Sequence, residues 1–109
     1  LTERGLTFAT ADGTMDGFFV RPEKGNHPGV ILWPDIAGIR EAKRGIARNL
    51  ALGGYAVLVL NPYYRDVAGD QFADFAAFVS DGGFQKVGPW RAKLTPEAVM
   101  RDARAAVDW

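Results

Sequence analysis

Two unbroken apolar runs, Gly29–Trp33 and Tyr55–Leu60, constrain the fold of this chain more than any other feature. Strands with one face in water alternate apolar and polar residues, whereas runs without alternation are typical of parallel sheets covered on both faces. Between the two runs, Arg40–Leu52 repeats apolar side chains at helical spacing, and Gly53-Gly54 is a typical helix end. The sequence therefore predicts a right-handed βαβ unit and an α/β fold class.

A β-hairpin is predicted before this unit. Leu6–Thr10 alternates apolar and polar residues, Asp12-Gly13 suits a tight turn, and Met15–Arg21 has the character of a return strand. We expect the hairpin to lie on the far side of the second apolar strand. That arrangement leaves one edge of Val30–Trp33 without a partner.

Helices and loops are predicted after the second apolar strand. Asp70–Val79 has helical periodicity, with one face formed by Phe72, Phe75, Ala76 and Val79. Phe84–Leu94 is predicted to be a loop anchored by aromatic residues that include Trp90. A last helix begins after Thr95, the expected N-cap, and runs to Trp109. The side chains expected to face inward from it are Val99, Ala103, Ala106 and Val107.

The strand inventory indicates a truncated domain. No segment after Leu60 is a strand candidate of comparable quality. An unpaired apolar strand edge is an aggregation hazard, and the last helix ends where a crossover to a further parallel strand is expected. We therefore expect residues 1–109 to be the N-terminal part of a single longer domain.

Composition excludes several functions. Thirteen Lys and Arg balance thirteen Asp and Glu without clustering, so the chain has no long-range field for nucleic acid or an anionic membrane. It contains no Cys, and hence no disulfide or thiolate metal site. No apolar run approaches the roughly 20 residues that span a bilayer. Nucleotide-binding glycine motifs are also missing. We expect a cytoplasmic protein with no cofactor and no metal, and the oligomeric state is left open.

Three short segments around the βαβ unit carry a family resemblance. Pro34-Asp35-Ile36-Ala37-Gly38 follows the first apolar strand, Leu50-Ala51-Leu52-Gly53-Gly54-Tyr55 precedes the second, and Asn61-Pro62-Tyr63-Tyr64-Arg65 follows it. Together they resemble the dienelactone hydrolase family. Its members carry an acidic residue, an apolar residue and a loop Gly after strand three, then L-A-x-x-G-Y before strand four. The resemblance is specific over Pro28–Arg65 and implies the N-terminal portion of an α/β-hydrolase fold.

The family's nucleophile is missing from these residues. The resemblance implies acyl transfer to water by a Cys or Ser in a G-x-C-x-G or G-x-S-x-G elbow, assisted by His and Asp. The single Ser, Ser80, has no flanking glycines, and the single His, His27, precedes a strand. The resemblance therefore implies a chain truncated before the nucleophile elbow, with the whole triad outside it and no activity of its own.

Four residues are the candidates for the half of the site that this chain holds. In this fold the loop after the first parallel strand donates a backbone N–H to the oxyanion hole, and by position that donor is Ile36. The resemblance implies that the carboxylate of Asp35, commonly Glu in the family, lies near the nucleophile. It also implies that Arg65 binds a substrate carboxylate with its planar guanidinium, next to Tyr64 as a second substrate-binding candidate.

Simpler interpretations of these residues stay open. Asp35 suits an N-cap of the following helix, and Ile36 suits plain packing. Arg65 suits a surface ion pair with Asp66 or Asp70, and Tyr63 and Tyr64 suit the wall or core of the domain.

The leading functional hypothesis is a hydrolase of small esters or lactones, with carboxylated substrates included. One alternative is a non-catalytic α/β-hydrolase-fold protein that binds a ligand or partner, since fold does not fix function. Another is a small doubly wound binding domain that is complete as given.

Overall fold

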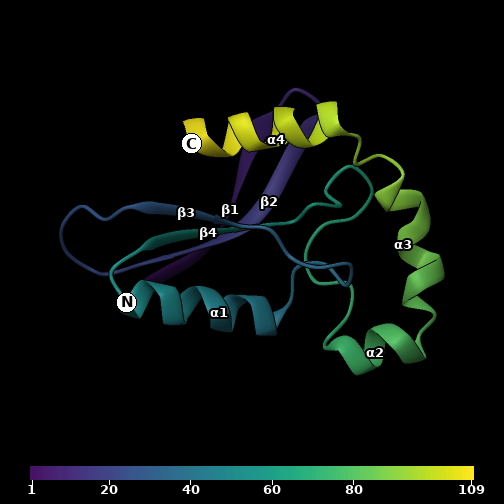
Figure 1. Cartoon of the computed structure of the whole chain (residues 1–109), viewed down its shortest axis with the longest axis horizontal. Coiled ribbons are helices and arrows are strands. Elements are labelled where there is room, and N and C mark those ends of the chain that lie inside the picture. The colour runs from purple at the N-terminus through teal and green to yellow at the C-terminus, as the bar shows by residue number, and fades with distance from the viewer.

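Two helices, α1 and α4, cover opposite faces of a mixed four-stranded sheet, and α2 and α3 lie beyond one end of it (Figure 1). The computed structural model describes all of residues 1–109. In chain order the elements are β1 (Thr2–Thr10), β2 (Gly13–Arg21), β3 (Gly29–Leu32), α1 (Glu41–Leu52), β4 (Ala56–Leu60), α2 (Phe75–Ser80), α3 (Gly83–Arg91) and α4 (Pro96–Asp108).

The strand order β1-β2-β4-β3 confirms the predicted topology. β3 and β4 pair in parallel and are joined through α1, as a βαβ unit requires. The hairpin of β1 and β2 pairs antiparallel with the far side of β4. β3 therefore lies at the edge of the sheet with one partner, and at four residues it is the shortest strand.

Side chains of alternating strand residues build one core on each face of the sheet. The α1 face buries Phe18, Val20, Ile39, Ala47, Ala51, Val57 and Val59. The α4 face buries Phe8, Met15, Leu58, Leu60, Tyr64 and Ala106. Consecutive β4 residues thus point to opposite cores, which explains why β4 is apolar without alternation.

A third core lies beyond the carboxyl ends of β3 and β4. There α2 and α3 pack against the loops that leave the two strands, and they bury Ala37, Tyr63, Phe72, Phe78 and Val87. Phe78 lies at the centre, with ring centroids 5.0 Å from Phe72 and 4.7 Å from Phe84. This core ties the candidate site loops to a helical wall.

The prediction of a loop at Phe84–Leu94 is wrong, because Gly83–Arg91 forms α3. Pro89 argued against a helix, since it lacks a donor and crowds the preceding turn. Tertiary packing outweighs that penalty: Val87 is fully buried, and the Trp90 ring lies 5.6 Å from the Tyr63 ring.

The helix predicted at Asp70–Val79 is shorter in the structure, and its buried residue does not belong to the predicted apolar face. α2 begins only at Phe75, because Asp74 is its N-cap and accepts the Ala77 N–H at 2.7 Å. Phe72 lies before the helix, and Phe78 is its buried residue. Phe75 and Val79, which belong to the predicted apolar face, are about half exposed.

The prediction for α4 is confirmed at its start and partly wrong on its face. Thr95 caps the helix by accepting the Ala98 N–H at 3.1 Å. Ala106 is buried as predicted, but Val107 is 73% exposed and the buried polar residue is Asp102. No helix in the chain combines the length and apolar character needed to cross a membrane.

Candidate functional site

The loops that leave the carboxyl ends of β3 and β4 meet in the third core. In parallel sheets this is the edge where ligands bind. The Tyr63 hydroxyl, from the loop after β4, donates to the Ile36 carbonyl oxygen at 2.7 Å, from the loop after β3. Tyr63 is itself 4% exposed, and burial raises the pKa of its hydroxyl, so it remains a donor at neutral pH.

The β3 loop forms a closed β-turn over Asp35–Gly38. The Gly38 N–H donates to the Asp35 carbonyl oxygen at 2.9 Å, and the Ala37 N–H donates to Asp35 Oδ1 at 3.1 Å. Gly38 has φ +80°, and a Cβ there would lie 3.4 Å from the Tyr63 ring. Both the positive φ and the close ring therefore favour glycine at this position.

The Ile36 N–H is the turn amide that donates to no acceptor within the chain. Its own peptide unit is held at the carbonyl end, because the Asp35 carbonyl accepts the Gly38 N–H. A peptide whose carbonyl accepts a hydrogen bond is polarised and donates more strongly. The arrangement therefore presents a fixed N–H donor, as a developing oxyanion requires.

Arg40 and Lys43 hold the Asp35 carboxylate. Arg40 donates from Nη1 to Oδ1 at 2.6 Å and from Nη2 to Oδ2 at 2.9 Å, and Lys43 Nζ lies 3.3 Å from Oδ2. The hydrogen bond from Arg40 is the main cause that lowers the pKa of Asp35 to about 2, with a smaller part from the Ala37 N–H and Lys43. Asp35 is thus ionised throughout the neutral range.

The helix-cap interpretation of Asp35 is wrong in detail. α1 begins at Glu41 and its N-cap is Arg40, whose side chain makes no capping bond. Asp35 instead caps the turn that precedes the helix, through the Ala37 N–H. Its predicted role beside a nucleophile stays a prediction.

Arg65 and Tyr64 lie in a separate network on the α4 side of the sheet. Arg65 binds both oxygens of Asp102, at 2.9 and 2.8 Å, and donates to Asp12 from Nε and Nη2 at 3.0 and 2.6 Å. The Tyr64 hydroxyl donates to Asp102 at 2.7 Å and lies 2.7 Å from Thr10 Oγ1. Burial is the main cause that raises the pKa of Tyr64 to about 12.

The partners predicted for Arg65 as an ion-pair residue, Asp66 and Asp70, are wrong. Asp70 binds Arg44 and Asp66 binds Lys93. The real partners are distant in sequence, in the hairpin turn and in α4. A substrate carboxylate would have to take the place of Asp12, so the substrate-binding role of Arg65 and Tyr64 stays a prediction.

Sequence reasoning missed Arg40, Asn61 and Asp102. Arg40 is 5% exposed although it is charged. Asn61 is 1% exposed and ties the loop after β4 to β2, donating to Asp16 Oδ1 at 2.8 Å and accepting the Tyr63 N–H at 3.0 Å. A polar residue directly after an apolar strand was the available signal for Asn61. For Asp102 the available signal was a charged residue within the apolar face of α4.

Neither Ser80 nor His27 takes part in this arrangement. Ser80 Oγ donates to the Ala77 carbonyl within α2, and His27 Nε2 pairs with the Lys24 carbonyl in the β2–β3 loop. No group of three or more His, Asp or Glu side chains is arranged to hold a metal ion.

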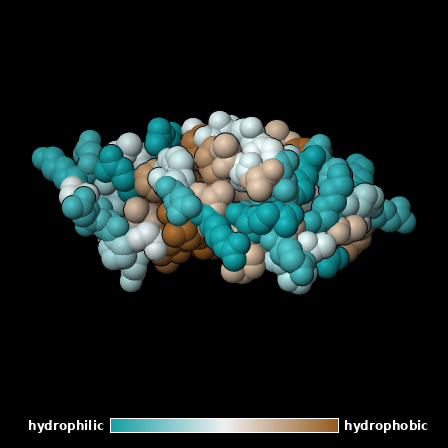
Figure 2. Space-filling model, turned by 90° about the horizontal axis from the view of Figure 1, so that it is seen from above, coloured by the Kyte–Doolittle hydropathy of each residue, from teal (hydrophilic) through white to brown (hydrophobic).

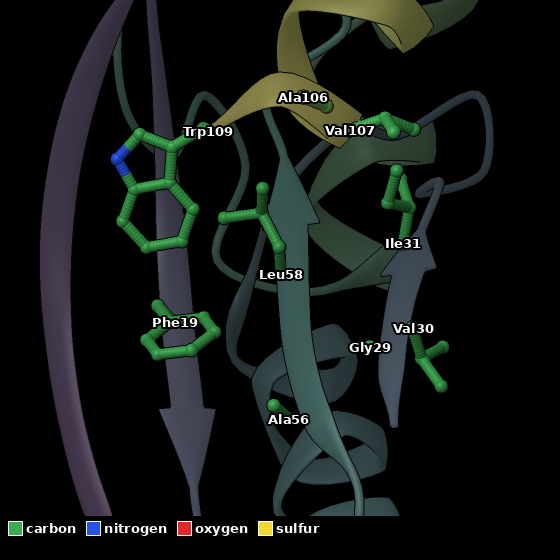
Figure 3. Close-up of a pocket in the computed structure, with 9 residues that line it drawn as sticks. All are labelled: Phe19, Gly29, Val30, Ile31, Ala56, Leu58, Ala106, Val107 and Trp109. Carbon is green, nitrogen blue, oxygen red and sulfur yellow. The ribbon is translucent and has the colours of Figure 1, made fainter. Parts of the chain in front are cut away.

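A groove on the α4 face lies away from this site. It has a volume of about 230 Å³ and is lined by Phe19, Gly29, Val30, Ile31, Ala56, Leu58, Ala106, Val107 and Trp109. Figure 3 shows Trp109 on the β2 side of the groove and Val30 and Ile31 on β3 across β4. Seen from the α4 side, apolar surface interrupts the polar exterior (Figure 2). The lining offers no acid, base or nucleophile.

Comparison with known proteins identifies the family of this chain. A sequence model of the Dienelactone hydrolase family matches residues 15–109. The chain belongs to the dienelactone hydrolase family. The match includes both site loops and all four helices, so it extends well beyond the Pro28–Arg65 segment that carried the resemblance.

The relatives of this chain include proteins with hydrolase names. Proteins from Salmonella typhi and Escherichia coli (strain K12), named provisionally as carboxymethylenebutenolidases, are each 34% identical over 108 residues. The alignments cover 96% of this chain and 37% of those proteins, so the chain spans well under half the length of these relatives. A solved structure of a dienelactone hydrolase-like promiscuous phosphotriesterase from metagenomic libraries is 30% identical, with a TM-score of 0.61. It matches 98% of this chain and 41% of its own.

Proposed function

We propose that residues 1–109 are the N-terminal part of one α/β-hydrolase domain whose parent protein hydrolyses small esters or lactones. Two facts support this proposal: the chain covers 37% of its curated relatives' length, and β3 has one strand partner. The reaction would be acyl transfer to water, with a Cys or Ser nucleophile, His and Asp supplied by residues outside this chain.

The Ile36 N–H carries the proposal. When a nucleophile attacks an ester carbonyl, the carbonyl oxygen becomes an oxyanion that needs fixed donors. The turn Asp35–Gly38 offers such a donor without an internal acceptor, at the sheet edge where the sites of α/β proteins form. A backbone amide suits this task because its N–H does not ionise near neutral pH and needs no reorganisation during the reaction.

Asp35 and Arg65 would give the site its charge pattern. Asp35 remains an anion with a pKa of about 2, so its proposed effect on a nearby nucleophile is electrostatic rather than proton transfer. Arg65 would orient a carboxylated substrate if that carboxylate replaced Asp12 on its guanidinium. A small-molecule substrate in the cytoplasm, with no cofactor, completes this proposal.

Covalent trapping in the parent protein tests the function directly. Incubation with aryl acetates and small lactones should give turnover, and a quenched sample should carry an acyl group on one Cys or Ser outside residues 1–109. An acyl group on Ser80 would contradict the proposal. Saturable binding of lactones without turnover would favour the non-catalytic alternative.

A further inference from the structure

Arg40 holds the turn that presents the Ile36 amide at both of its ends. Its Nη1 donates to Asp35 Oδ1 at 2.6 Å and to the Gly38 carbonyl oxygen at 3.2 Å, and its Nη2 donates to Asp35 Oδ2 at 2.9 Å. Asp35 and Gly38 are the first and last residues of the turn. One guanidinium therefore closes the turn from outside its hydrogen-bonded ring.

The burial of Arg40 is hard to explain as ordinary surface charge. The residue is 5% exposed, and its Nε is buried without a hydrogen-bond partner. Burying a donor without a hydrogen-bond partner destabilises the folded state. By contrast, Arg44 and Arg48 on the same side of α1 pair with acids in exposed positions. The structure thus keeps Arg40 in a costly position next to the turn.

Tyr63 completes the support from the opposite direction. Its hydroxyl donates to the Ile36 carbonyl at 2.7 Å, and its ring lies against Gly38. Arg40 fixes the ends of the turn while Tyr63 fixes its centre. The Ile36 N–H is left as the free donor between two restraints.

We propose that Arg40 is a positioning residue for the oxyanion donor, acting through Asp35 and Gly38 rather than by contact with substrate. This inference rests on the proposed function, because the positioned amide matters to catalysis only in a hydrolase. An oxyanion donor must already be in place before the reaction, since reorganisation would cost part of its stabilising effect. Arg40 supplies that restraint in the free protein.

Lysine cannot replace Arg40 in this role. The guanidinium spreads its donors over a rigid planar fork, which here reaches two carboxylate oxygens and a carbonyl together. An ammonium is a single point of charge, so Arg40→Lys would keep the ion pair with Asp35 and lose the bidentate geometry. The two variants Arg40→Lys and Arg40→Gln therefore separate charge from geometry.

The experiment compares these variants with Arg48→Gln in the parent protein. Arg48 lies on the same helix and pairs with Glu3 and Glu41 without touching the turn, so it is a matched loss of an ion-paired arginine. Two quantities are measured: the hydrogen-exchange rate of the Gly38 amide, which closes the turn, and kcat and KM for a neutral aryl acetate.

We expect Arg40→Gln to speed Gly38 exchange at least tenfold and to lower kcat at least tenfold, with KM changed less than threefold. Arg40→Lys should recover only part of each effect, and Arg48→Gln should leave both quantities near the wild-type values. Trapping the acyl group counts the folded enzyme, so kcat is corrected for any loss of folded protein, and Arg48→Gln shows how far the loss of an ion-paired arginine alone changes either quantity.

Unchanged Gly38 exchange in Arg40→Gln would overturn the inference. Faster exchange with unchanged kcat would overturn it as well, since the turn would then be loosened without consequence. A wild-type parent protein that hydrolyses no ester would defeat the proposed function. Faster Gly38 exchange in that inactive protein would still support the hold of Arg40 on the turn.

Discussion

Replacing Asp35 with Asn tests the electrostatics of the turn. Asn keeps the size of the side chain and an oxygen for the Ala37 N–H, but it removes the charge that Arg40 and Lys43 bind. The pKa of Asp35 lies at about 2 in the folded protein against 3.8 for the free side chain. At about 1.36 kcal/mol per pH unit, that difference of about 1.8 sets a ceiling of about 2.4 kcal/mol.

Solvent screening reduces this ceiling. The Asp35 side chain is 41% exposed, so we expect Asp35→Asn to lower the free energy of unfolding at pH 7 by about 1 kcal/mol. The folded pKa is depressed, so this contribution is complete above about pH 4 and is lost as the pH falls through 2. The wild type should therefore approach the variant in acid.

Urea unfolding of both proteins at several pH values measures the effect. The gap in free energy should be constant from pH 5 to 7 and should narrow below about pH 4. Arg48→Gln serves as the control for loss of an exposed ion pair elsewhere, between α1 and β1. A gap that stays constant down to pH 2.5, or no gap at pH 7, would refute the account of Asp35.

Three further changes test the rest of the site. Asp102→Ala should lower the free energy of unfolding by about 3 kcal/mol in denaturant titrations, because it leaves Arg65 without the partner that is fully buried; a loss under 1 kcal/mol would contradict this. Tyr63→Phe removes the hydrogen bond to Ile36, so stability should fall by about 1 kcal/mol and kcat with it, and an unchanged kcat would count against a role for the loop contact. Arg65→Ala should raise KM for carboxylated esters far more than for neutral ones; equal effects would leave Arg65 only its ion pairs with Asp12 and Asp102.

The sheet was predictable because its signals are local. The segments of β3 and β4 are unbroken apolar runs, which are typical of parallel strands. The helical repeat between them predicted the helix that connects the two strands. Those features needed no knowledge of distant partners. The position of the hairpin next to β4 followed from the same reasoning, and the register of β2 with β4 agrees with it.

The helices after β4 were predicted less well because tertiary contacts decide them. Pro89 indicates a break by its local chemistry, yet Val87 and Trp90 gain enough packing to keep the segment helical. Helical spacing allows more than one apolar face to be drawn through Phe72, Phe75 and Phe78. Only the core formed with Tyr63 and Ala37 selects Phe78 as the buried ring.

The candidate site also combines residues that local sequence identifies with residues that only tertiary contacts identify. Ile36 could be named as a candidate donor from its position in the fold, because the loop after a parallel strand lies at the sheet edge where ligands bind. Arg40, the N-cap of α1, could not be distinguished from the arginines within α1, since its burial depends on how the turn folds back. Arg65 was identified, but its partners Asp12 and Asp102 lie 53 and 37 residues away in the chain.

Ile36→Pro in the parent protein tests most directly whether the Ile36 N–H stabilises the oxyanion. Ile36 is the second residue of its β-turn, a position that favours proline, so the N–H can be removed with the turn retained. Ile36→Val is the matched control, which keeps the amide. We expect kcat to fall by about 10²–10³ in Ile36→Pro and to stay near the wild-type value in Ile36→Val. A folded Ile36→Pro protein with wild-type kcat would contradict it.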